Sequence, residues 1–558
     1  MRRLSGFGLV GPGLMGLLCG LSTPATAQEL RGPELQAASN FGQTWNQVVF
    51  DAAAAEGITA LRDELHWDYG EREGTYVFDH PILTFPEAMA AAGMSLTLIT
   101  LGTHPDHDAG ATPYTAPAVA AYAAFFAEVA RRFPAVVAVE VGNEMNSETF
   151  TAGPAREADI TGRAGYYAAL LAATSDAVRA ARPDVRIIGG AAHSIPLAWF
   201  GALSADGAAA KMDTIGLHPY TTPPEQLRRQ VALLREVPGF ETLPLELTEI
   251  GTEDPAEAPA LLARTYCQAA LAGAATLAWY PLNARGDGFV PLLTDDGAVT
   301  DVGRTWKLLK AEMQGRAVAD AAPDPFTYAC RFGDSALLIW GAARDMVLAD
   351  GLAAYDLAGT PVAAPRLDPE APLLVLSDGP APVIGDTVML GPQSVVADSF
   401  DQFTYPGGTG DGFDRFVRAG ETRVDFILGL GQQTNGVPWT PYLTTERDGW
   451  VRLEAGFGQP SMWDGVPVEI VHAFTAPEAM TLALEARVAP YAETSDGVSF
   501  ALLLGGAPLA ETVVQSPAVL APPPVTLAAG EVLEIVLGPG ESPDGDATDF
   551  RFTLRRAD

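Results

Sequence analysis

The sequence predicts an α/β protein whose main part is a (β/α)8 (TIM) barrel, followed by two β-rich regions. Between about residues 36 and 316, short apolar runs alternate with helical segments rich in Ala and Leu. Helices that connect successive strands make those strands parallel, and eight such units close a barrel. Beyond this region the helical pattern stops. The chain of 558 residues is also longer than one hydrophobic core usually organises, so more than one domain is expected. A doubly wound open sheet is the alternative, but no Gly-rich phosphate-binding turn follows the first strand.

The barrel strands are expected at short apolar runs, because strands that are buried on both faces are apolar along their length. The eight runs are Ala38–Phe41, Ile58–Leu65, Ser95–Leu101, Val136–Val141, Val185–Gly189, Thr214–Leu217, Leu243–Leu247 and Ala275–Trp279. The clearest amphipathic helices between them are Pro117–Arg132, Gly165–Ala181, Glu225–Glu236 and Ala256–Leu271. With these elements, the barrel domain is expected to span residues 28–320.

Two β-rich regions follow the barrel. Residues 321–385 are expected to form a small β-sandwich packed on the barrel, with strands at Ala336–Trp340, Ala353–Leu357 and Leu373–Leu376. A Pro- and Gly-containing linker is expected over residues 377–395. Residues 397–558 are expected to form a β-sandwich or jelly-roll accessory domain, with strands at Thr481–Val488, Val498–Leu504 and Val532–Leu537.

The first 27 residues are expected to be a secretory signal. Arg2 and Arg3 precede the short apolar stretch Leu9–Leu21, and small residues around Ala27 form a cleavage site. A membrane anchor is the weaker alternative, because the stretch is short and is interrupted by Gly and Pro. The protein is therefore expected to be secreted, periplasmic or extracellular, after cleavage near Ala27, and not held in a membrane.

Acidic residues greatly outnumber basic ones. There are 69 Asp and Glu against 34 Lys and Arg, for a formal net charge of −35. This charge favours solubility and disfavours nucleic acid and anionic membranes as partners. After signal removal only Cys267 and Cys330 remain; they could form one disulfide, although two buried free thiols are the interpretation we favour. The oligomeric state is not determined by these features.

Two glutamates follow or end apolar strand-like runs. Glu144 comes directly after the run at Val136–Val141, and Glu249 ends the segment Leu245–Glu249. Residues at the C-terminal ends of barrel strands lie on the face that carries active sites. Two facing carboxyl groups supply the acid and the nucleophile or base that cleave a glycosidic bond. The sequence therefore indicates a carbohydrate substrate.

The motifs around these glutamates resemble those of clan A glycoside hydrolases, most closely family 39 and its relatives. The motifs are Gly142-Asn143-Glu144, Thr248-Glu249, the segment Leu61–Trp67 and Gly216-Leu217-His218-Pro219-Tyr220. They occur in order on successive expected strands, and the resemblance covers about residues 36–385. Residues 450–558 resemble a jelly-roll module attached to many secreted bacterial carbohydrate-active proteins, which implies that the accessory domain could bind carbohydrate.

The resemblance implies a retaining mechanism and a role for each motif residue. Glu249 would be the nucleophile and Glu144 the acid/base, with its pKa raised by burial or by its anionic neighbour. Arg62 would keep Glu249 ionised, Tyr220 would donate a hydrogen bond to it, and Asn143 would bind the sugar 2-hydroxyl. Trp279 would be an aromatic platform beneath the sugar, with packing in the core as the alternative.

Four further residues are substrate-binding candidates, of which His218 could equally be a core histidine. They are His218, His104, Trp67 and Asn283. His104 and His107 resemble a metal-ligand pair, but the acidic residues beside them do not complete a site, so neither a metal nor another cofactor is expected. In the C-terminal region, Trp439 could stack on a sugar or could be a core aromatic.

The function expected from these features is that of a secreted retaining β-glycoside hydrolase acting on a polysaccharide or oligosaccharide. A transglycosylase could use the same two glutamates. A non-catalytic carbohydrate-binding protein on a degenerate barrel is the alternative from a different class, because a fold alone does not determine function.

Overall fold

The structure is a computed structural model that describes residues 29–432, 438–447, 449–492 and 496–557. The expected signal segment lies outside the described residues. Within them, none of the helices combines the length and the apolar character needed to cross a bilayer.

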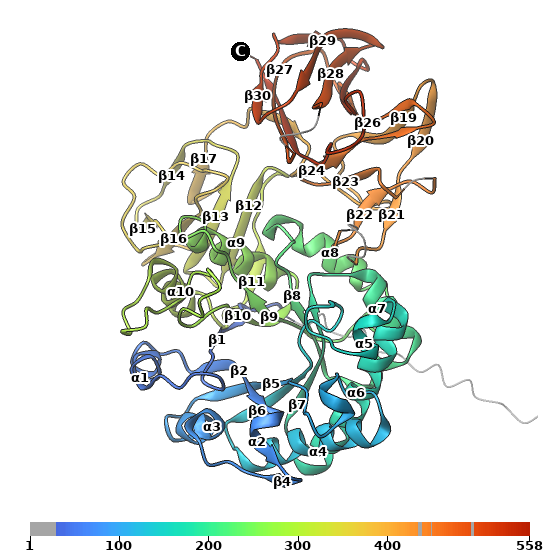
Figure 1. The fold of residues 1–558 in the computed structure, drawn as a ribbon. Coiled ribbons are helices and arrows are strands. Elements are labelled where there is room, and N and C mark those ends of the chain that lie inside the picture. The colour runs from blue at the N-terminus through green and yellow to red at the C-terminus, as the bar shows by residue number, and fades with distance from the viewer. Residues whose placement is uncertain (1–28, 433–437, 448, 493–495, 558) are drawn as a thin grey trace, which may run out of the picture.

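The first part of the chain forms a closed barrel of parallel strands (Figure 1). The strand order around the barrel is β1-β10-β9-β8-β7-β6-β5-β2, which confirms the predicted TIM-barrel fold. The barrel strands are β1 (Glu34–Ala38), β2 (Ala60–His66), β5 (Ser95–Leu101), β6 (Val136–Val141), β7 (Arg186–His193), β8 (Thr214–His218), β9 (Leu245–Ile250) and β10 (Ala274–Trp279). A small hairpin, β3 (Glu71–Arg72) and β4 (Thr75–Tyr76), follows β2.

Helices surround the barrel and bury one face against it. They are α1 (Gln47–Ala55), α2 (Trp67–Gly70), α3 (Pro81–Ala91), α4 (Ala116–Arg132), α5 (Pro154–Glu157), α6 (Ile160–Ala181), α7 (Leu197–Ala205), α8 (Leu227–Leu234), α9 (Ala258–Leu271) and α10 (Asp301–Glu312). Helix α6 begins five residues before the expected Gly165, because the Asp159 side chain accepts a hydrogen bond from the Gly162 amide and so caps the helix there.

The first barrel strand lies earlier in the chain than the expected Ala38–Phe41. Strand β1 ends at Ala38, and the following residues turn around the carboxylate of Asp63 in β2. Asp63 accepts hydrogen bonds from the Ser39 hydroxyl and from the Phe41 amide, the latter at 2.7 Å. These bonds replace strand pairing, so the apolar Phe41 belongs to a loop rather than to the barrel wall.

A middle sheet follows the barrel, with order β11-β12-β13-β16-β15, accompanied by the two-stranded pair β14-β17. Its strands are β11 (Val318–Asp320), β12 (Thr327–Phe332), β13 (Ala336–Gly341), β14 (Met346–Leu348), β15 (Leu352–Tyr355), β16 (Leu373–Ser377) and β17 (Val388–Leu390). Alternate residues of β13 point to opposite faces. Leu338 and Trp340 join the barrel core, whereas Leu337 and Ile339 pack in a separate core with Val388.

The two cysteines of the described chain form a disulfide between the barrel and the middle sheet. Cys267 in α9 and Cys330 in β12 are bonded, with their Cα atoms 5.7 Å apart and a sequence separation of 63. The favoured expectation of two free thiols is therefore wrong, because helix packing on the sheet brings the two side chains together. Disulfides are typical of oxidising compartments.

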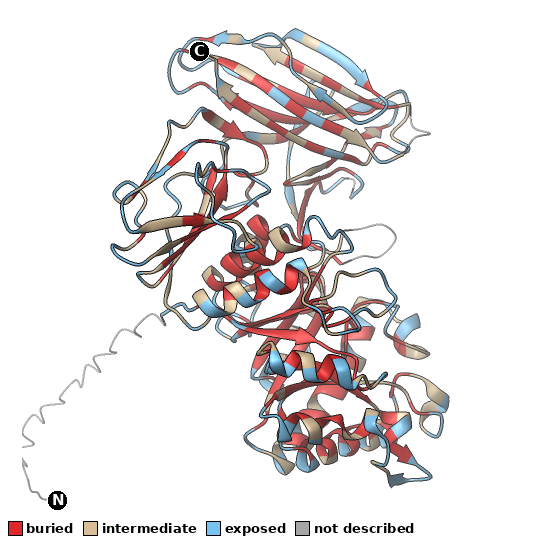
Figure 2. Ribbon diagram, turned by 90° about the vertical axis from the view of Figure 1, so that its left-hand side faces the viewer, coloured by how far each residue is buried: buried red, intermediate tan, exposed pale blue. Residues whose placement is uncertain are grey.

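The C-terminal region forms two packed antiparallel sheets. One has the order β21-β22-β23-β24-β33-β27-β30 with β18 and β31 attached, and the other has β20-β19-β26-β32-β28-β29 with β25 attached. Figure 2 shows buried and exposed residues alternating along these strands, as expected when one face of each sheet covers a shared core.

The bounds of these strands are β18 (Val395–Asp398), β19 (Asp414–Ala419), β20 (Thr422–Asp425), β21 (Ile427–Gly429), β22 (Tyr442–Thr444), β23 (Arg452–Glu454), β24 (Phe457–Gln459), β25 (Ser461–Trp463), β26 (Val466–Thr475), β27 (Met480–Pro490), β28 (Val498–Leu504), β29 (Ala507–Val514), β30 (Ala518–Leu520), β31 (Val525–Leu527), β32 (Val532–Gly538) and β33 (Thr548–Arg556). The expected linker at residues 377–395 contains β17, which pairs with β14, and ends where β18 begins pairing with β33.

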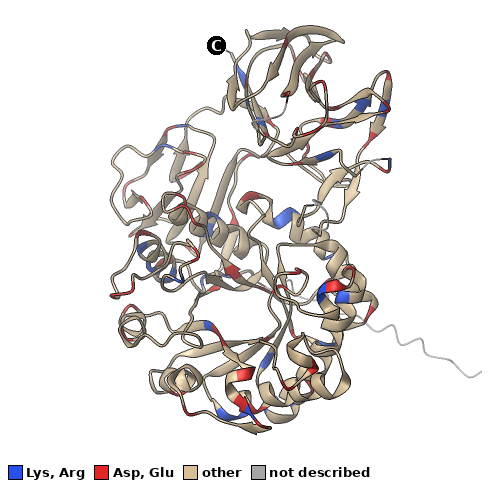
Figure 3. Ribbon diagram, in the orientation of Figure 1, with Lys and Arg blue, Asp and Glu red and all other residues tan. Residues whose placement is uncertain are grey.

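The three parts contact one another through polar side chains. Tyr328 of the middle sheet donates a hydrogen bond to Asp401 of the C-terminal region at 3.0 Å, and Arg229 of α8 donates to the Asp401 carbonyl at 2.6 Å. Figure 3 shows acidic residues in the barrel and in both β-rich regions, so the negative charge is not confined to one part.

Candidate active site

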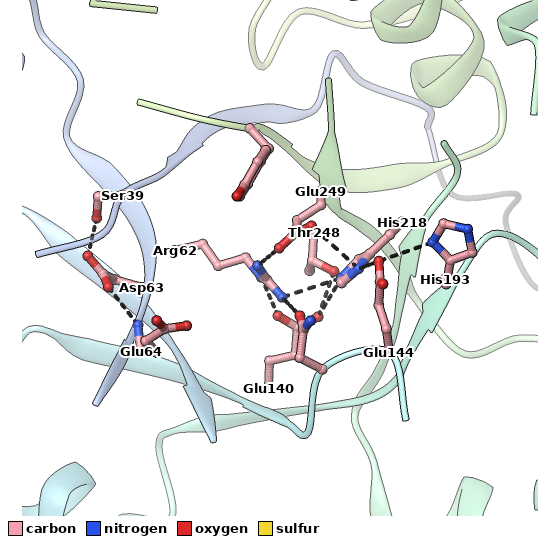
Figure 4. Close-up of polar contacts among 12 residues, drawn as sticks. Ser39, Arg62, Asp63, Glu64, Glu140, Glu144, His193, His218, Thr248 and Glu249 are labelled. Carbon is pink, nitrogen blue, oxygen red and sulfur yellow. Dashed lines mark hydrogen bonds and ion pairs between the residues drawn. The ribbon is translucent and has the colours of Figure 1, made fainter. Parts of the chain in front are cut away.

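The C-terminal ends of β6, β7, β8 and β9, together with a residue inside β2, bring a set of charged side chains together (Figure 4). Arg62 comes from β2, Glu140 from the end of β6, His193 from the end of β7, His218 from the end of β8 and Glu249 from β9. Glu144 lies in the loop directly after β6. Parallel strands that close into a barrel present these ends at one face, so residues far apart in sequence become neighbours.

Arg62 occupies the centre of this set and is only 1% exposed. Its guanidinium donates to Glu140 and to Glu249, donates to Asn143 Oδ1 at 2.9 Å and lies 3.3 Å from His218 Nε2. Burial lowers the pKa of Arg62, but the two carboxylates outweigh burial and raise it. The guanidinium is therefore a permanent cation that keeps Glu249 oriented.

Glu249 has a different hydrogen-bond donor at each carboxylate oxygen. Oε1 accepts from Arg62, and Oε2 accepts from the Tyr220 hydroxyl at 2.9 Å. The side chain of Glu249 is 11% exposed and lines the adjoining pocket. A donor at each oxygen fixes the orientation of this carboxylate.

Glu144 is held by two histidines. Its Oε1 atom lies 2.8 Å from His218 Nδ1 and 3.3 Å from His193 Nδ1. The backbone at Glu144 has φ of 45°, a left-handed conformation that is costly for a residue with a side chain. A hydrogen bond from its amide to the Ala191 carbonyl at 2.7 Å stabilises this conformation.

The two glutamates face each other at short range. One carboxylate oxygen of Glu144, one of Glu249 and a ring nitrogen of His218 all lie within 4.8 Å of one another. Both carboxyl groups border the same open pocket. A single sugar carbon placed in this pocket is within reach of both groups.

The pKa of Glu144 in this network differs from the raised value that was expected from the sequence. Burial raises the pKa of Glu144, but hydrogen bonds from His193 and His218 outweigh burial and lower the pKa to about 2. For His218, burial lowers the pKa, but the charge of Glu249 and hydrogen bonds to Glu140 and Glu144 raise it to about 9. The expected rise in the pKa of Glu144 is therefore wrong for the free protein, because hydrogen bonds from the two histidines favour its ionised form.

The same three groups are the ones in the described chain whose ligand atoms are close enough for a metal ion. The arrangement does not fit a metal centre. A protonated His218 has no lone pair at Nδ1 to offer, Arg62 adds a second cation beside Glu249, and a divalent ion would meet both charges.

The pocket beside the glutamates has a volume of about 740 Å³, within the usual range for small-ligand sites. Its wall combines aromatic rings and hydrogen-bonding groups. The residues that line it beyond the two glutamates include Ser39, Gln43, Arg62, Glu64, Asn143, Phe150, His193, Tyr220, Tyr280, Arg285, Asp287 and Phe289. Apolar rings with a few polar groups suit the C–H faces and hydroxyls of a sugar.

A second cavity of about 820 Å³ adjoins the pocket. It lies among the barrel, the middle sheet and the C-terminal sandwich, and it shares Tyr220, Gly251 and Thr252 with the pocket wall. The open space at the barrel mouth therefore extends beyond the volume of one sugar.

Six of the ten residues predicted from sequence meet at this site: Glu144, Glu249, Asn143, Arg62, His218 and Tyr220. His218 is wholly buried and acts on the carboxylates rather than lining the pocket. Glu140 supports the site by accepting hydrogen bonds from Arg62 and Thr248.

The other four predicted residues do not line the pocket, and their interpretation as substrate contacts is wrong. Trp279 is wholly buried and its indole N–H donates to the Val290 carbonyl at 2.9 Å. Trp67 is also buried and donates to Glu71 at 2.7 Å, and His104 lies 3.1 Å from the Glu71 carbonyl. Asn283 is buried near Asp295. The polar atoms named for Trp279, Trp67 and His104 are paired within the fold, whereas Asn283 Oδ1 is buried without a hydrogen-bond partner among the described residues.

The sequence interpretation missed His193 and the ring residues Tyr280 and Phe289. The expected strand ends at Gly189, before His193. In the structure β7 continues to His193 through a register shift between Gly189 and Ala192. Tyr280 follows Trp279 directly, so the aromatic wall of the pocket lies one residue beyond the expected one.

The fold and the site together define a TIM-barrel protein with a pair of facing carboxyl groups at the C-terminal end of the barrel. Similar solved structures are glycoside hydrolases. A family 39 glycoside hydrolase from the gut symbiont Bacteroides cellulosilyticus WH2 aligns over 62% of this chain and 81% of its own, with 17% identity and a TM-score of 0.52. The resemblance to clan A enzymes is thereby confirmed at the level of the fold.

Two further structures align with TM-scores below 0.5. A family 39 β-xylosidase from Caulobacter crescentus covers 63% of this chain and 98% of its own at 17% identity, with a TM-score of 0.45. A glucosidase from Croceicoccus marinus covers 91% and 96% at 11% identity, with a TM-score of 0.44. No family model matches the sequence, and no curated protein matches it.

Proposed function

We propose that the protein is a secreted retaining β-glycoside hydrolase that acts on a polysaccharide or oligosaccharide, with Glu249 as nucleophile and Glu144 as acid/base. The observation that carries the proposal is the placement of carboxylate oxygens of Glu144 and Glu249 within 4.8 Å of each other at an open pocket. Retaining enzymes have carboxyl groups about 5–5.5 Å apart, whereas inverting enzymes leave about 6.5–9.5 Å for a water molecule. The short separation favours retention.

In the first step, Glu249 attacks the anomeric carbon while the bond to the leaving oxygen breaks. Arg62 and Tyr220 orient the attacking carboxylate through its two oxygens. The leaving oxygen takes a proton from Glu144, and the products are a glycosyl ester on Glu249 and a free alcohol. Asn143, at the pocket wall beside Arg62, is positioned to contact the sugar 2-hydroxyl.

The proton for this step is held by the pair of Glu144 and His218. The charge of Glu249 is a main reason that the pKa of His218 is high. When Glu249 becomes a neutral ester, this charge disappears, and the proton moves from His218 Nδ1 through Glu144 to the leaving oxygen. In the second step a water molecule attacks the ester and returns its proton to Glu144 and His218, while Glu249 is released as a carboxylate.

The proton balance predicts an alkaline limit to activity. Because the pKa of His218 is raised from its ordinary value of 6.5 to about 9, the pair keeps its proton through neutral pH and loses it above about pH 9. We expect kcat/KM for a glycoside with a poor leaving group to fall about tenfold for each pH unit above that value. A pH profile measured on such a substrate tests this expectation.

An activated aryl glycoside is the control for that profile. Its leaving group needs little protonation, so its alkaline decline should be much weaker over the same pH range. A decline that begins near pH 6.5 with the poor leaving group would show that the pKa of His218 is not raised.

The substrate class and compartment are supported by features outside the two glutamates. The adjoining cavity and the C-terminal sandwich extend the surface near the pocket, which suits a chain of several sugars. The acidic composition and the disulfide between Cys267 and Cys330 support secretion into an oxidising compartment.

The test is the hydrolysis of a panel of aryl β-glycosides and polysaccharides, with the anomeric configuration of the first-formed product followed by NMR. We expect hydrolysis of at least one substrate with retention of configuration. Inversion would contradict the role of Glu249 as nucleophile. No hydrolysis of any member of a broad panel would favour a carbohydrate-binding role.

A further inference from the structure

A segment of the C-terminal sandwich reaches the active-site face of the barrel. It lies between β21 and β22, which in Figure 1 extend from the sandwich toward α7 and α8. The Leu430 carbonyl accepts a hydrogen bond of 2.8 Å from the amide of Leu197, the first residue of α7. Two described side chains of this segment, Gln432 and Trp439, contact the residues around Glu144.

Gln432 binds to Asn146, which lies two residues after Glu144. The Gln432 amide nitrogen donates to the Asn146 carbonyl at 2.9 Å, and the Asn146 amide nitrogen lies 3.4 Å from Gln432 Oε1. Gln432 is 5% exposed and Asn146 is fully buried. Because buried amides are costly to leave without partners, this pairing joins the sandwich firmly to the loop that carries Glu144.

Asn146 in turn holds the backbone of His193. Its Oδ1 atom accepts from the His193 amide at 3.0 Å, and its Nδ2 atom donates to the His193 carbonyl at 3.1 Å. A single side chain therefore links Gln432, the loop after β6 and the end of β7.

Trp439 contacts the ring of His193 directly. The two ring centroids are 4.8 Å apart with an interplanar angle of 77°, an edge-to-face geometry. The His193 ring also stacks on Tyr220, with centroids 6.0 Å apart and an angle of 23°. Contacts with two aromatic rings restrict the orientation of the imidazole, whose Nδ1 atom lies 3.3 Å from Glu144 Oε1.

We propose that Gln432 and Trp439 of the C-terminal sandwich are positioning residues for the acid/base Glu144, and that they act through Asn146 and His193. This inference rests on the proposed function. It makes the sandwich a working part of the active site rather than only an accessory domain, because the barrel strands alone do not supply the contacts that orient His193 at this side.

The proposal is tested with Trp439→Ala and Gln432→Ala in the full-length protein, on two glycosides of the same sugar. One has an activated aryl leaving group and the other an unactivated alcohol or second sugar. If Glu144 is no longer held in position, kcat/KM for the unactivated substrate should fall about 10- to 100-fold. For the activated substrate, kcat/KM should stay within about twofold of that of the unaltered protein. Trp439→Phe keeps an aromatic edge beside His193 and should restore most of the activity.

Trp450→Ala is the matched control, because Trp450 lies in the same sandwich and is 56% exposed. It should leave both substrates unchanged. Equal losses on both substrates in Trp439→Ala and Gln432→Ala, or no loss in either variant, would overturn the proposal. If one variant fails to fold, the other decides the question alone.

Different results would contradict the proposed function and the positioning role of Gln432 and Trp439. If the unaltered protein hydrolyses no glycoside, the proposed function fails. If the protein is active and Glu144→Gln shows strong leaving-group dependence while the two sandwich variants do not, only this inference is wrong.

Discussion

Replacing Glu249 by alanine is expected to lower kcat for an activated aryl glycoside by at least about a thousandfold, because it removes the carboxylate that forms the glycosyl ester. The substitution leaves space beside Arg62 and Tyr220, which held the lost carboxylate. A small anion such as azide fits this cationic space and can attack in its place. Added azide should therefore restore part of the turnover and give a glycosyl azide of configuration opposite to that of the substrate, measured by NMR.

Glu236→Ala is the control for this variant, because Glu236 is an exposed glutamate of the barrel outside the site. It should retain full activity. Unchanged hydrolysis by Glu249→Ala, or an azide product of unchanged configuration, would show that a different group is the nucleophile.

Replacing Glu144 by glutamine should have an effect that depends on the leaving group. Glutamine keeps the size of the side chain but cannot transfer a proton, so kcat/KM for a substrate with a poor leaving group should fall about 10²- to 10⁴-fold. An activated substrate should still form the ester on Glu249, but water attack on that ester should be slow. We expect a burst of released aryl alcohol followed by a slow steady state in stopped-flow measurements.

Azide provides a second readout of the same variant, because an anionic nucleophile needs no general base. It should accelerate the slow phase and give a glycosyl azide with the configuration of the substrate. Glu148→Gln, in the same loop but with its side chain 73% exposed, should behave like the unaltered protein. Equal losses on both substrates would rule out Glu144 as the acid.

The residues that sequence interpretation located correctly share one property: the fold alone determines where their backbones lie. Arg62, Glu144, His218, Tyr220 and Glu249 are in or directly after β2, β6, β8 and β9. Parallel strands of a closed barrel bring these ends together whatever the details of packing. The strand pattern and the order of motifs were therefore enough to predict the cluster.

The misplaced residues depend on local register. The pairing of β9 with β10 shifts between Leu277 and Trp279, and a shift of one residue exchanges the two faces of a strand. Trp279 consequently packs in the core, and the pocket is lined by Tyr280 instead. A similar shift in β7 carries the strand to His193, beyond a Gly-Gly pair that resembles a turn.

The amino-acid sequence by itself determined the barrel, its two β-rich additions and the two glutamates, since these follow from hydrophobic periodicity and from strand ends, which are local properties. Only the tertiary structure decided the protonation of the two glutamates and histidines, and which residues hold these side chains in position. The pKa of Glu144 depends on His193 and His218, and the orientation of His193 depends on Gln432 and Trp439, more than two hundred residues further along the chain. Such contacts arise from the packing of separate domains, and electrostatic interactions depend on distances in space that no local pattern records.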